Sequence, residues 1–306
     1  MDQQPIISII TPCLNRSEFV IEAVESVLNQ DYPNIEHIIM DGGSTDGTLE
    51  VLTKFPHLQV ISKPDRGIYD ALNKGLKYAS GEIIGFLNTD DYYEPDIFGT
   101  VIEEFKKNPT ADALIGSATL FKKNSQDRNY VVERIGCIQQ EELLFRSTQG
   151  APIFNAWFFR RELFEKFGLF DNSFLYAADR DFLIRMVLRN IQYHSINLHI
   201  YNYRIHPASF TFNDRDNGES EVMFEFRNIA EHNLQRAIPS DYKKIIRIWH
   251  SQITSDQTIT ALKNSALGRS SKYVVRGMRY NKNWPMIFLD RIVHRTFQFI
   301  IRRVAK

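Results

Sequence analysis

The chain has 306 residues, of which 43% are hydrophobic and 24% are charged, and its formal net charge is zero. This composition predicts a globular protein of one or two domains and excludes a disordered chain. The only cysteines, Cys13 and Cys137, exclude a disulfide framework and indicate a reducing compartment. We expect a cytoplasmic protein, because no signal-peptide pattern and no run of roughly 18 apolar residues is visible.

The zero net charge hides an asymmetry along the chain. Residues 240–306 carry fourteen Lys and Arg against three Asp, a net charge of +11, whereas residues 1–239 carry −11. Within residues 286–306, arginines and one glutamine share a helical face: Arg291, Arg295, Gln298 and Arg302. This pattern predicts an amphipathic helix that lies on an anionic membrane surface and does not span it. A helix packed on the rest of the protein is the alternative.

The first 90 residues alternate apolar, β-branched runs with amphipathic segments. Expected strands cover residues 6–11, 35–40, 58–62 and a run that begins at 83, and expected helices cover 18–30, 48–55 and 68–79. This alternation predicts a parallel α/β sheet with right-handed crossovers. The strand-to-helix loops of such a sheet meet at its carboxyl edge, where ligands bind. We therefore expect four loops to converge there: 11–15, 41–47, 63–67 and 88–91.

After residue 95 the pattern is mixed. Helices are expected over 96–107, 162–167 and 179–189, and strands over 113–121, 129–135, 151–160 and 192–204. From about residue 214 the chain turns helical and then basic. The predicted fold class is α/β, with a mainly parallel, Rossmann-like sheet, an antiparallel second section and a helical extension. The predicted domains are residues 1–213 and 214–306.

An acidic pair follows the strand that begins at Ile83. In the segment EIIGFLNTDDYYEP, the apolar run changes abruptly to polar residues, and Asp90 and Asp91 come where the strand leaves the core. Two adjacent carboxylates repel each other, and a divalent cation relieves that repulsion. Oxygen-only ligands suit Mg²⁺ or Mn²⁺. A solvated acidic loop is the alternative interpretation.

Four motifs occur in an order that resembles the family 2 glycosyltransferases. They are IISIITPCLNR, HIIMDGGSTDGT, KPDRGIYDALNKGLKYASGEIIGFLNTDDYYEPD and GLFDNSFLYAADRDFLIRM, and the resemblance covers roughly residues 5–210. It implies a GT-A fold, a nucleotide-diphosphate sugar donor, a divalent metal and inversion at the anomeric carbon. The processive synthases carry a Gln-x-x-Arg-Trp motif that is absent here, so one sugar per encounter is expected, as in non-processive bacterial enzymes of cell-surface glycans.

The resemblance also implies roles for individual residues. Thr11, Pro12 and Asp41 would contact the base of the nucleotide. Arg66 and Asn73 would lie near the base and the diphosphate, and Asp90 would contact the ribose. The metal would be held by Asp91, and Asp179 would be the catalytic base. The sequence departs from the family pattern at Leu14, Asn88 and Ala178, the last of which replaces the glutamate that precedes the base.

Two carboxylates compete for the role of base. Asp179 and Asp181 are two residues apart, so on a helix they point about 200° from each other and only one can face the cleft. Asp179 lies at the expected start of the helix, which favours it as the base, although a helix cap is the alternative role. Three other conspicuous residues receive ordinary interpretations: Trp157 as core, His206 as a loop histidine and Cys13 as a buried thiol.

The leading interpretation is a glycosyltransferase with a UDP-sugar as the leading donor and a glycan or lipid-linked acceptor. No nucleic-acid partner is expected, and the basic helix would place the protein peripherally on the inner face of the cell membrane. A sugar-phosphate nucleotidyltransferase and a non-catalytic nucleotide-sugar-binding protein remain as alternatives. The first would need a Gly-rich phosphate loop after the first strand, where the chain reads TPCLNR.

Overall fold

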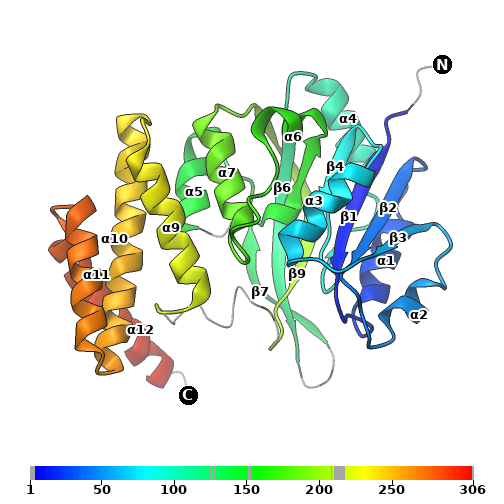
Figure 1. Ribbon diagram of the computed structural model, residues 1–306. Coiled ribbons are helices and arrows are strands. Elements are labelled where there is room, and N and C mark those ends of the chain that lie inside the picture. The colour runs from blue at the N-terminus through cyan, green and yellow to red at the C-terminus, as the bar shows by residue number, and fades with distance from the viewer. Residues whose placement is uncertain are drawn as a thin grey trace. The chain divides into compact units, whose positions relative to one another are not determined.

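The structure is a computed structural model that describes residues 4–124, 126, 128–150, 153–207, 209 and 218–304, with side chains to residue 294. The chain forms two compact units (Figure 1). Unit 1 comprises Met1–Ser147 and Ala151–Pro207, and unit 2 comprises Thr148–Gly150 and Ala208–Lys306. The expected boundary between residues 213 and 214 lies outside the described residues.

The first four strands of unit 1 form the parallel part of its sheet. They are β1 (Ile7–Cys13), β2 (Ile35–Asp41), β3 (Leu58–Ser62) and β4 (Ile83–Phe86), in the order β3-β2-β1-β4. The crossovers contain α1 (Val20–Leu28), α2 (Thr48–Leu52) and α3 (Ile68–Tyr78). The expected elements are confirmed here, since buried β-branched runs form strands and apolar residues at helical spacing form helices.

The second half of the sheet is mixed. Its strands are β5 (Tyr92–Tyr93), β6 (Ala113–Lys123), β7 (Asn129–Ile135), β8 (Trp157–Arg160) and β9 (Tyr193–Arg204). The order continues from β4 through β8, β6 and β9 to β5, and β7 pairs with β6. Strand β8 is antiparallel to both neighbours, whereas β9 runs parallel to β6. The expected antiparallel section is therefore present, with one parallel pair inside it.

Helices α4 (Phe98–Lys107), α6 (Glu162–Phe167) and α7 (Ala178–Leu188) form where they were expected. Helix α5 (Leu143–Gln149) was not expected. The expected strand over 151–160 is shorter, because a 3₁₀ turn at Phe154–Ala156 precedes β8 and residues 151–152 lie outside the described part.

Six phenylalanines form the core that joins β4, β8, α6 and α7. Their ring centroids lie 5.0–6.5 Å apart in stacked, tilted and edge-to-face pairs. Aromatic pairs at such distances add stabilisation beyond the area that they bury. The members of this core are Phe86, Phe154, Phe159, Phe164, Phe170 and Phe182. The start of α7 is thereby fixed relative to the end of β4.

Unit 2 consists of helices in its described part. They are α9 (Glu221–Gln235), α10 (Ser240–Lys263), α11 (Leu267–Tyr280) and α12 (Trp284–Val304), and α10 contacts the other three. The expected C-terminal helix is confirmed and begins at Trp284. Among the residues that the structure describes, no helix is both long enough and apolar enough to cross a membrane.

Gly85 in β4 tests how tightly the sheet is packed. A Cβ atom there would lie 2.7 Å from Ile9 Cδ1 and 2.9 Å from a Phe158 ring carbon. We expect Gly85→Ala to lower the free energy of unfolding by about 1–3 kcal/mol, the usual cost of overpacking. Thermal and denaturant melting would measure it. The control is Gly136→Ala, where a Cβ atom would meet no atom within 4 Å; equal stability of the two variants would contradict the packing described here.

Candidate active site

Three of the four expected loops converge at the carboxyl edge of the parallel strands. The Asn15 N–H donates to Ser44 Oγ and the Thr45 N–H donates to Asn15 Oδ1, both at 2.8 Å. The Gly42 N–H donates to the Cys13 carbonyl and the Lys63 N–H to the Asp41 carbonyl, also at 2.8 Å. The loops after β1, β2 and β3 therefore form one hydrogen-bonded surface, as the topology predicted.

Asp41 organises this edge from inside. Its carboxylate is buried and accepts hydrogen bonds from the Ser44 hydroxyl, the Ser62 hydroxyl and the N–H groups of Gly43 and Ser44. Burial alone would raise the pKa of Asp41, but these hydrogen bonds outweigh it and hold the pKa below its ordinary value. These hydrogen bonds thus favour the ionised carboxylate, which shapes the turn after β2.

Thr11 and Pro12 lie inside β1 and are buried. Thr11 Oγ1 lies 2.9 Å from His37 Nε2, and burial lowers the pKa of His37 to about 3, so this imidazole is neutral. Beyond them, Cys13 is buried, and burial raises the pKa of its thiol to about 12. Leu14 is the first residue of this loop with an exposed side chain. Any contact of Thr11 with a ligand would therefore be indirect, through the loop that it supports.

Asp91 is enclosed by the protein. Its exposed fraction is 1%. Its carboxylate accepts hydrogen bonds from the Tyr201 hydroxyl at 2.8 Å, the Arg204 N–H at 2.8 Å and the Asn88 amide at 3.2 Å. Burial, and then the charge of Asp90, raise the pKa of Asp91, while these three donors oppose the shift. The Asp91 carboxylate thus connects the end of β9 with the segment that follows β4.

Asp90, in contrast, reaches the surface. Its side chain is 20% exposed, and its Oδ2 atom lies 2.9 Å from His206 Nε2. The guanidinium of Arg204 donates to the Asp90 carbonyl at 2.8 Å and also contacts Glu22 of α1. The imidazole of His206 stacks on Phe19, with ring centroids 4.9 Å apart. A carboxylate oxygen and an imidazole nitrogen therefore meet at the end of β4.

The two carboxylates of α7 have separate environments. Asp181 is buried and its Oδ2 atom forms an ion pair with Arg185 Nε at 2.7 Å, so it belongs to the packed side of the helix. Asp179 lies in the first turn and is half-buried. Burial raises the pKa of Asp179, opposed by the charge of Arg180 and by a hydrogen bond from the Tyr69 side chain. Asp179 and Asp181 therefore lie on different sides of α7, as helix geometry predicted.

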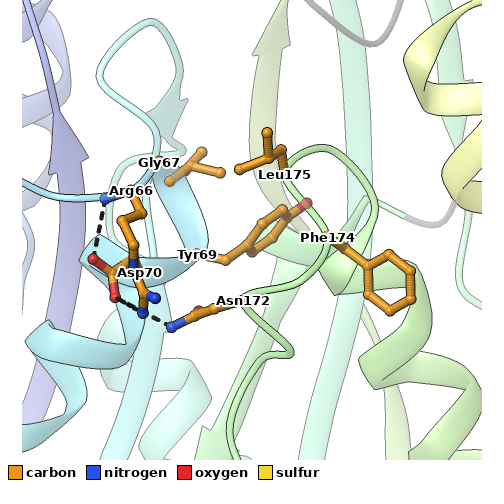
Figure 2. Close-up of a pocket in the computed structure, with 8 residues that line it drawn as sticks. Arg66, Gly67, Tyr69, Asp70, Asn172, Phe174 and Leu175 are labelled. Carbon is orange, nitrogen blue, oxygen red and sulfur yellow. Dashed lines mark hydrogen bonds and ion pairs between the residues drawn. The ribbon is translucent and has the colours of Figure 1, made fainter.

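A shallow depression lies between α3 and the segment before α7 (Figure 2). Figure 2 shows the Tyr69 ring projecting from α3 toward the loop that carries Phe174 and Leu175. The Tyr69 hydroxyl donates to the Tyr176 carbonyl at 3.3 Å. Tyr69 therefore connects the start of α3 with the segment that precedes Asp179.

Arg66 and Asn73 differ in accessibility. The Arg66 side chain is largely exposed at the rim of the depression and pairs with Asp70 at 3.2 Å. Asn73 is buried: its amide donates to the Phe170 carbonyl at 2.9 Å, and its Oδ1 accepts from the Phe170 N–H at 3.0 Å. Asn73 thus attaches the segment before α7 to α3, and its predicted contact with the diphosphate would require these bonds to break.

The two sides of the site share one support. Asn155 donates to the Phe86 carbonyl at 3.2 Å, four residues before Asp90. Phe182, one helical turn after Asp179, belongs to the same phenylalanine core as Phe86. The strand that precedes Asp90 and the helix that carries Asp179 therefore pack on one aromatic cluster.

Two residues of this arrangement, Tyr69 and Tyr201, were not singled out from the sequence, and His206 was interpreted there only as a loop histidine. Tyr69 and Tyr201 act through contacts with residues more than 100 positions away. His206 carried a usable signal, because RIHPAS directly follows the last strand of the sheet. Trp157 is core, as expected, and stacks on Phe159 at 5.9 Å.

The enclosure of Asp91 predicts a structural effect of its removal. We expect Asp91→Ala to lower the free energy of unfolding by about 2–5 kcal/mol, because the Arg204 N–H and the Tyr201 hydroxyl lose their buried acceptor. Thermal melting would measure this, with Asp290→Ala, at an exposed carboxylate, as the control. Unchanged melting together with lost Mn²⁺ binding would instead support the metal role that the sequence predicted for Asp91.

Comparison with known proteins finds several relatives. EpsJ of Bacillus subtilis, an uncharacterised glycosyltransferase, is 29% identical over 220 residues, which cover 68% of this chain and 63% of that protein. Hyaluronan synthase of Pasteurella multocida is 39% identical over 114 residues, which cover 36% of this chain and 12% of that protein. The poly-beta-1,6-N-acetyl-D-glucosamine synthase of Staphylococcus epidermidis is 36% identical over 147 residues, or 45% of this chain and 35% of that protein.

Solved structures share the fold. Residues 1–349 of S. aureus TarS, in complex with UDP-GlcNAc, match with a TM-score of 0.62 and 16% identity over 92% of each chain. The mannosyltransferase PcManGT of Pyrobaculum calidifontis, in complex with GDP-Man and Mn²⁺, matches with a TM-score of 0.56 and 16% identity over 95% of this chain and 86% of that one. The family model described as glycosyl transferase family 2 matches residues 8–168, just over half of the chain. The chain therefore belongs to glycosyl transferase family 2 and has the GT-A fold.

Proposed function

We propose that the protein transfers one sugar from a nucleotide-diphosphate sugar to a hydroxyl of a glycan or lipid-linked acceptor, with inversion. The observation that carries this proposal is a half-buried carboxylate, Asp179, held at the start of a helix on the same aromatic core as the acidic end of β4. Membership in a family of glycosyltransferases supports the reaction type. The TarS complexes with UDP and with UDP-GlcNAc favour a UDP-sugar.

In this proposal Asp179 is the general base. Single displacement needs a carboxylate that removes the proton of the acceptor hydroxyl as that oxygen attacks the anomeric carbon. A raised pKa makes Asp179 a stronger base than an ordinary aspartate, and the bond from Tyr69 orients it. Asp181 cannot share this role, because its oxygen is engaged with Arg185 on the packed side of α7.

The donor set at the end of β4 fits a divalent metal. We propose that Asp90 and His206 would hold it, in place of the enclosed Asp91. Mn²⁺ accepts both a carboxylate oxygen and an imidazole nitrogen. The described residues contain no cluster of three His, Cys, Asp or Glu, which fits an ion that takes its remaining ligands from substrate phosphates. When bound, such an ion would stabilise charge on the leaving diphosphate.

The nucleotide would lie along the edge formed by the loops after β1, β2 and β3. Asp41 and Thr11 would act there by shaping loops, whereas the side chains of Leu14 and Arg66 are exposed. We propose that Arg66 pairs with the diphosphate, since its guanidinium is exposed at the rim of the depression. The acceptor would enter on the side of Tyr69 and Leu175, next to the base.

The role of Asp179 can be tested by a conservative substitution. Asp179→Asn should lower the transfer rate by on the order of 10²–10⁴ and leave donor affinity near that of the wild type, because a general base acts only in the chemical step. Release of UDP and formation of labelled product would be followed for a panel of donors. In the wild type, kcat/KM should fall at low pH with an apparent pKa above the ordinary aspartate value, since the base must be ionised.

Asp181→Asn serves as the matched control for this test. It should lower stability through the lost pairing with Arg185, while the folded enzyme keeps its rate. Exchange of these two results would make Asp181 the base, and retained anomeric configuration of the product by NMR would exclude single displacement.

The metal assignment predicts a second pair of effects. Asp90→Asn and His206→Ala should each weaken Mn²⁺-dependent binding of UDP at least about tenfold, because each removes a proposed ligand. Isothermal titration with and without Mn²⁺ would measure this without any turnover. His194→Ala, at an exposed histidine of β9, is the control. If neither variant changed the Mn²⁺ dependence, the ion would have to be held elsewhere.

A further inference from the structure

Helix α12 carries an exposed apolar face. Met286 is 73% exposed, Leu289 62%, Ile292 38% and Val293 68%. These four residues, called here the outer face of α12, lie within about 120° of one another around the helix. Soluble proteins normally turn such a stripe toward their core. A contiguous apolar surface of this kind marks a site of interaction.

The inner face of α12 is already occupied by contacts within unit 2. Trp284 is buried, and its indole N–H donates to Thr254 Oγ1 of α10 at 2.9 Å. The guanidinium of Arg291 pairs with the buried carboxylate of Asp256, with Nε 3.1 Å from Oδ1. These contacts fix the rotation of α12, so its apolar residues cannot turn inward without breaking a buried ion pair.

This geometry changes the interpretation of the arginine stripe. The sequence predicted that the stripe would face an anionic surface, but Arg291, its described member, faces α10. The side chains of Arg295, Gln298 and Arg302 lie outside the described residues. Contact with a bilayer would thus begin with the outer face, and positive charge would come from elsewhere in unit 2.

Helix α11 repeats the arrangement. Leu267, Val275 and Met278 are 71%, 68% and 49% exposed, and their spacing places them on one side of the helix. The opposite side packs through Tyr273 and Gly277, where a Cβ atom would lie 2.1 Å from Trp284 Nε1. Five exposed basic residues belong to α11 and the turn after it: Arg269, Lys272, Arg276, Arg279 and Lys282. Arg269 pairs with Glu219 and Arg276 pairs with Glu231.

The positive charge of residues 240–306 indicates what binds the outer face of α12. Residues 240–306 carry a net charge of +11, so symmetric pairing of this region with the same region of a second copy would bring like charge against like charge. An anionic bilayer offers both an apolar interior for the outer face and negative headgroups for the basic residues. We infer that unit 2 docks on an anionic lipid bilayer by inserting the outer face of α12. The inference does not depend on which sugar is transferred.

The test uses the full chain and sedimentation with vesicles. Vesicles of equal parts phosphatidylcholine and phosphatidylglycerol should bind the protein at low salt, phosphatidylcholine alone should bind it weakly, and about 0.5 M NaCl should release it. The double variant Leu289→Ser/Val293→Ser should reduce the partition coefficient on the order of tenfold or more. The matched control is Val131→Ser/Val132→Ser on β7, which changes two other exposed valines and should bind like the wild type.

Two further measurements test the basic residues and the exposure of the outer face of α12. Lys272→Ser/Lys282→Ser should lower the salt concentration that releases the protein. The Leu289→Ser/Val293→Ser variant should melt like the wild type, since both side chains are exposed; early melting would mean that the face packs within the protein and would overturn the inference. Equal binding of the wild type to both vesicle types would also overturn the inference. So would a wild-type dimer that is lost in the Leu289→Ser/Val293→Ser variant.

Discussion

The buried carboxylate of Asp91 is the interaction on which the site most depends. It accepts from Tyr201 and Arg204 of β9 and from Asn88, so it joins the segment after β4 to the end of β9; Asp91 and Arg204 lie 113 positions apart in the chain. A buried carboxyl group is tolerated only when its oxygens are hydrogen-bonded, and these three donors supply those bonds. The bond fixes where β9 ends, and with it the position of His206 beside Asp90.

The pairs Asp90/Asp91 and Asp179/Asp181 each contain one enclosed and one accessible carboxylate. Asp91 is buried and accepts hydrogen bonds, and Asp181 is buried and forms an ion pair with Arg185. Asp90 and Asp179 are partly exposed. In each pair the backbone sends the two side chains in different directions. One carboxylate of each pair therefore holds the element in place, and its neighbour remains accessible.

The two units are stabilised by different means. Unit 1 buries apolar strands and a phenylalanine core. Helix α10 of unit 2 instead buries hydroxyls that donate to its own carbonyls, as Ser251 does to Arg247 at 2.7 Å and Thr258 does to Thr254 at 2.7 Å. Polar side chains thus share the interior of unit 2 with apolar ones such as Ile246 and Trp249, while large apolar side chains of α11 and α12 are exposed.

The sequence by itself determined the order of the elements and the edge at which the loops meet. It did so because helical and strand periodicities are local and because parallel strands place all their carboxyl ends together. It also determined that Asp179 and Asp181 face opposite ways, since that follows from helix geometry alone.

Only the tertiary structure decided which carboxylate of a pair is enclosed. The burial of Asp91 depends on Tyr201 and Arg204, and that of Asn73 on Phe170, partners that no local pattern identifies. The rotation of α12 is likewise set by Thr254 and Asp256. Amphipathicity shows that a helix has two faces, but the buried partners of Trp284 and Arg291 decide which one is turned outward.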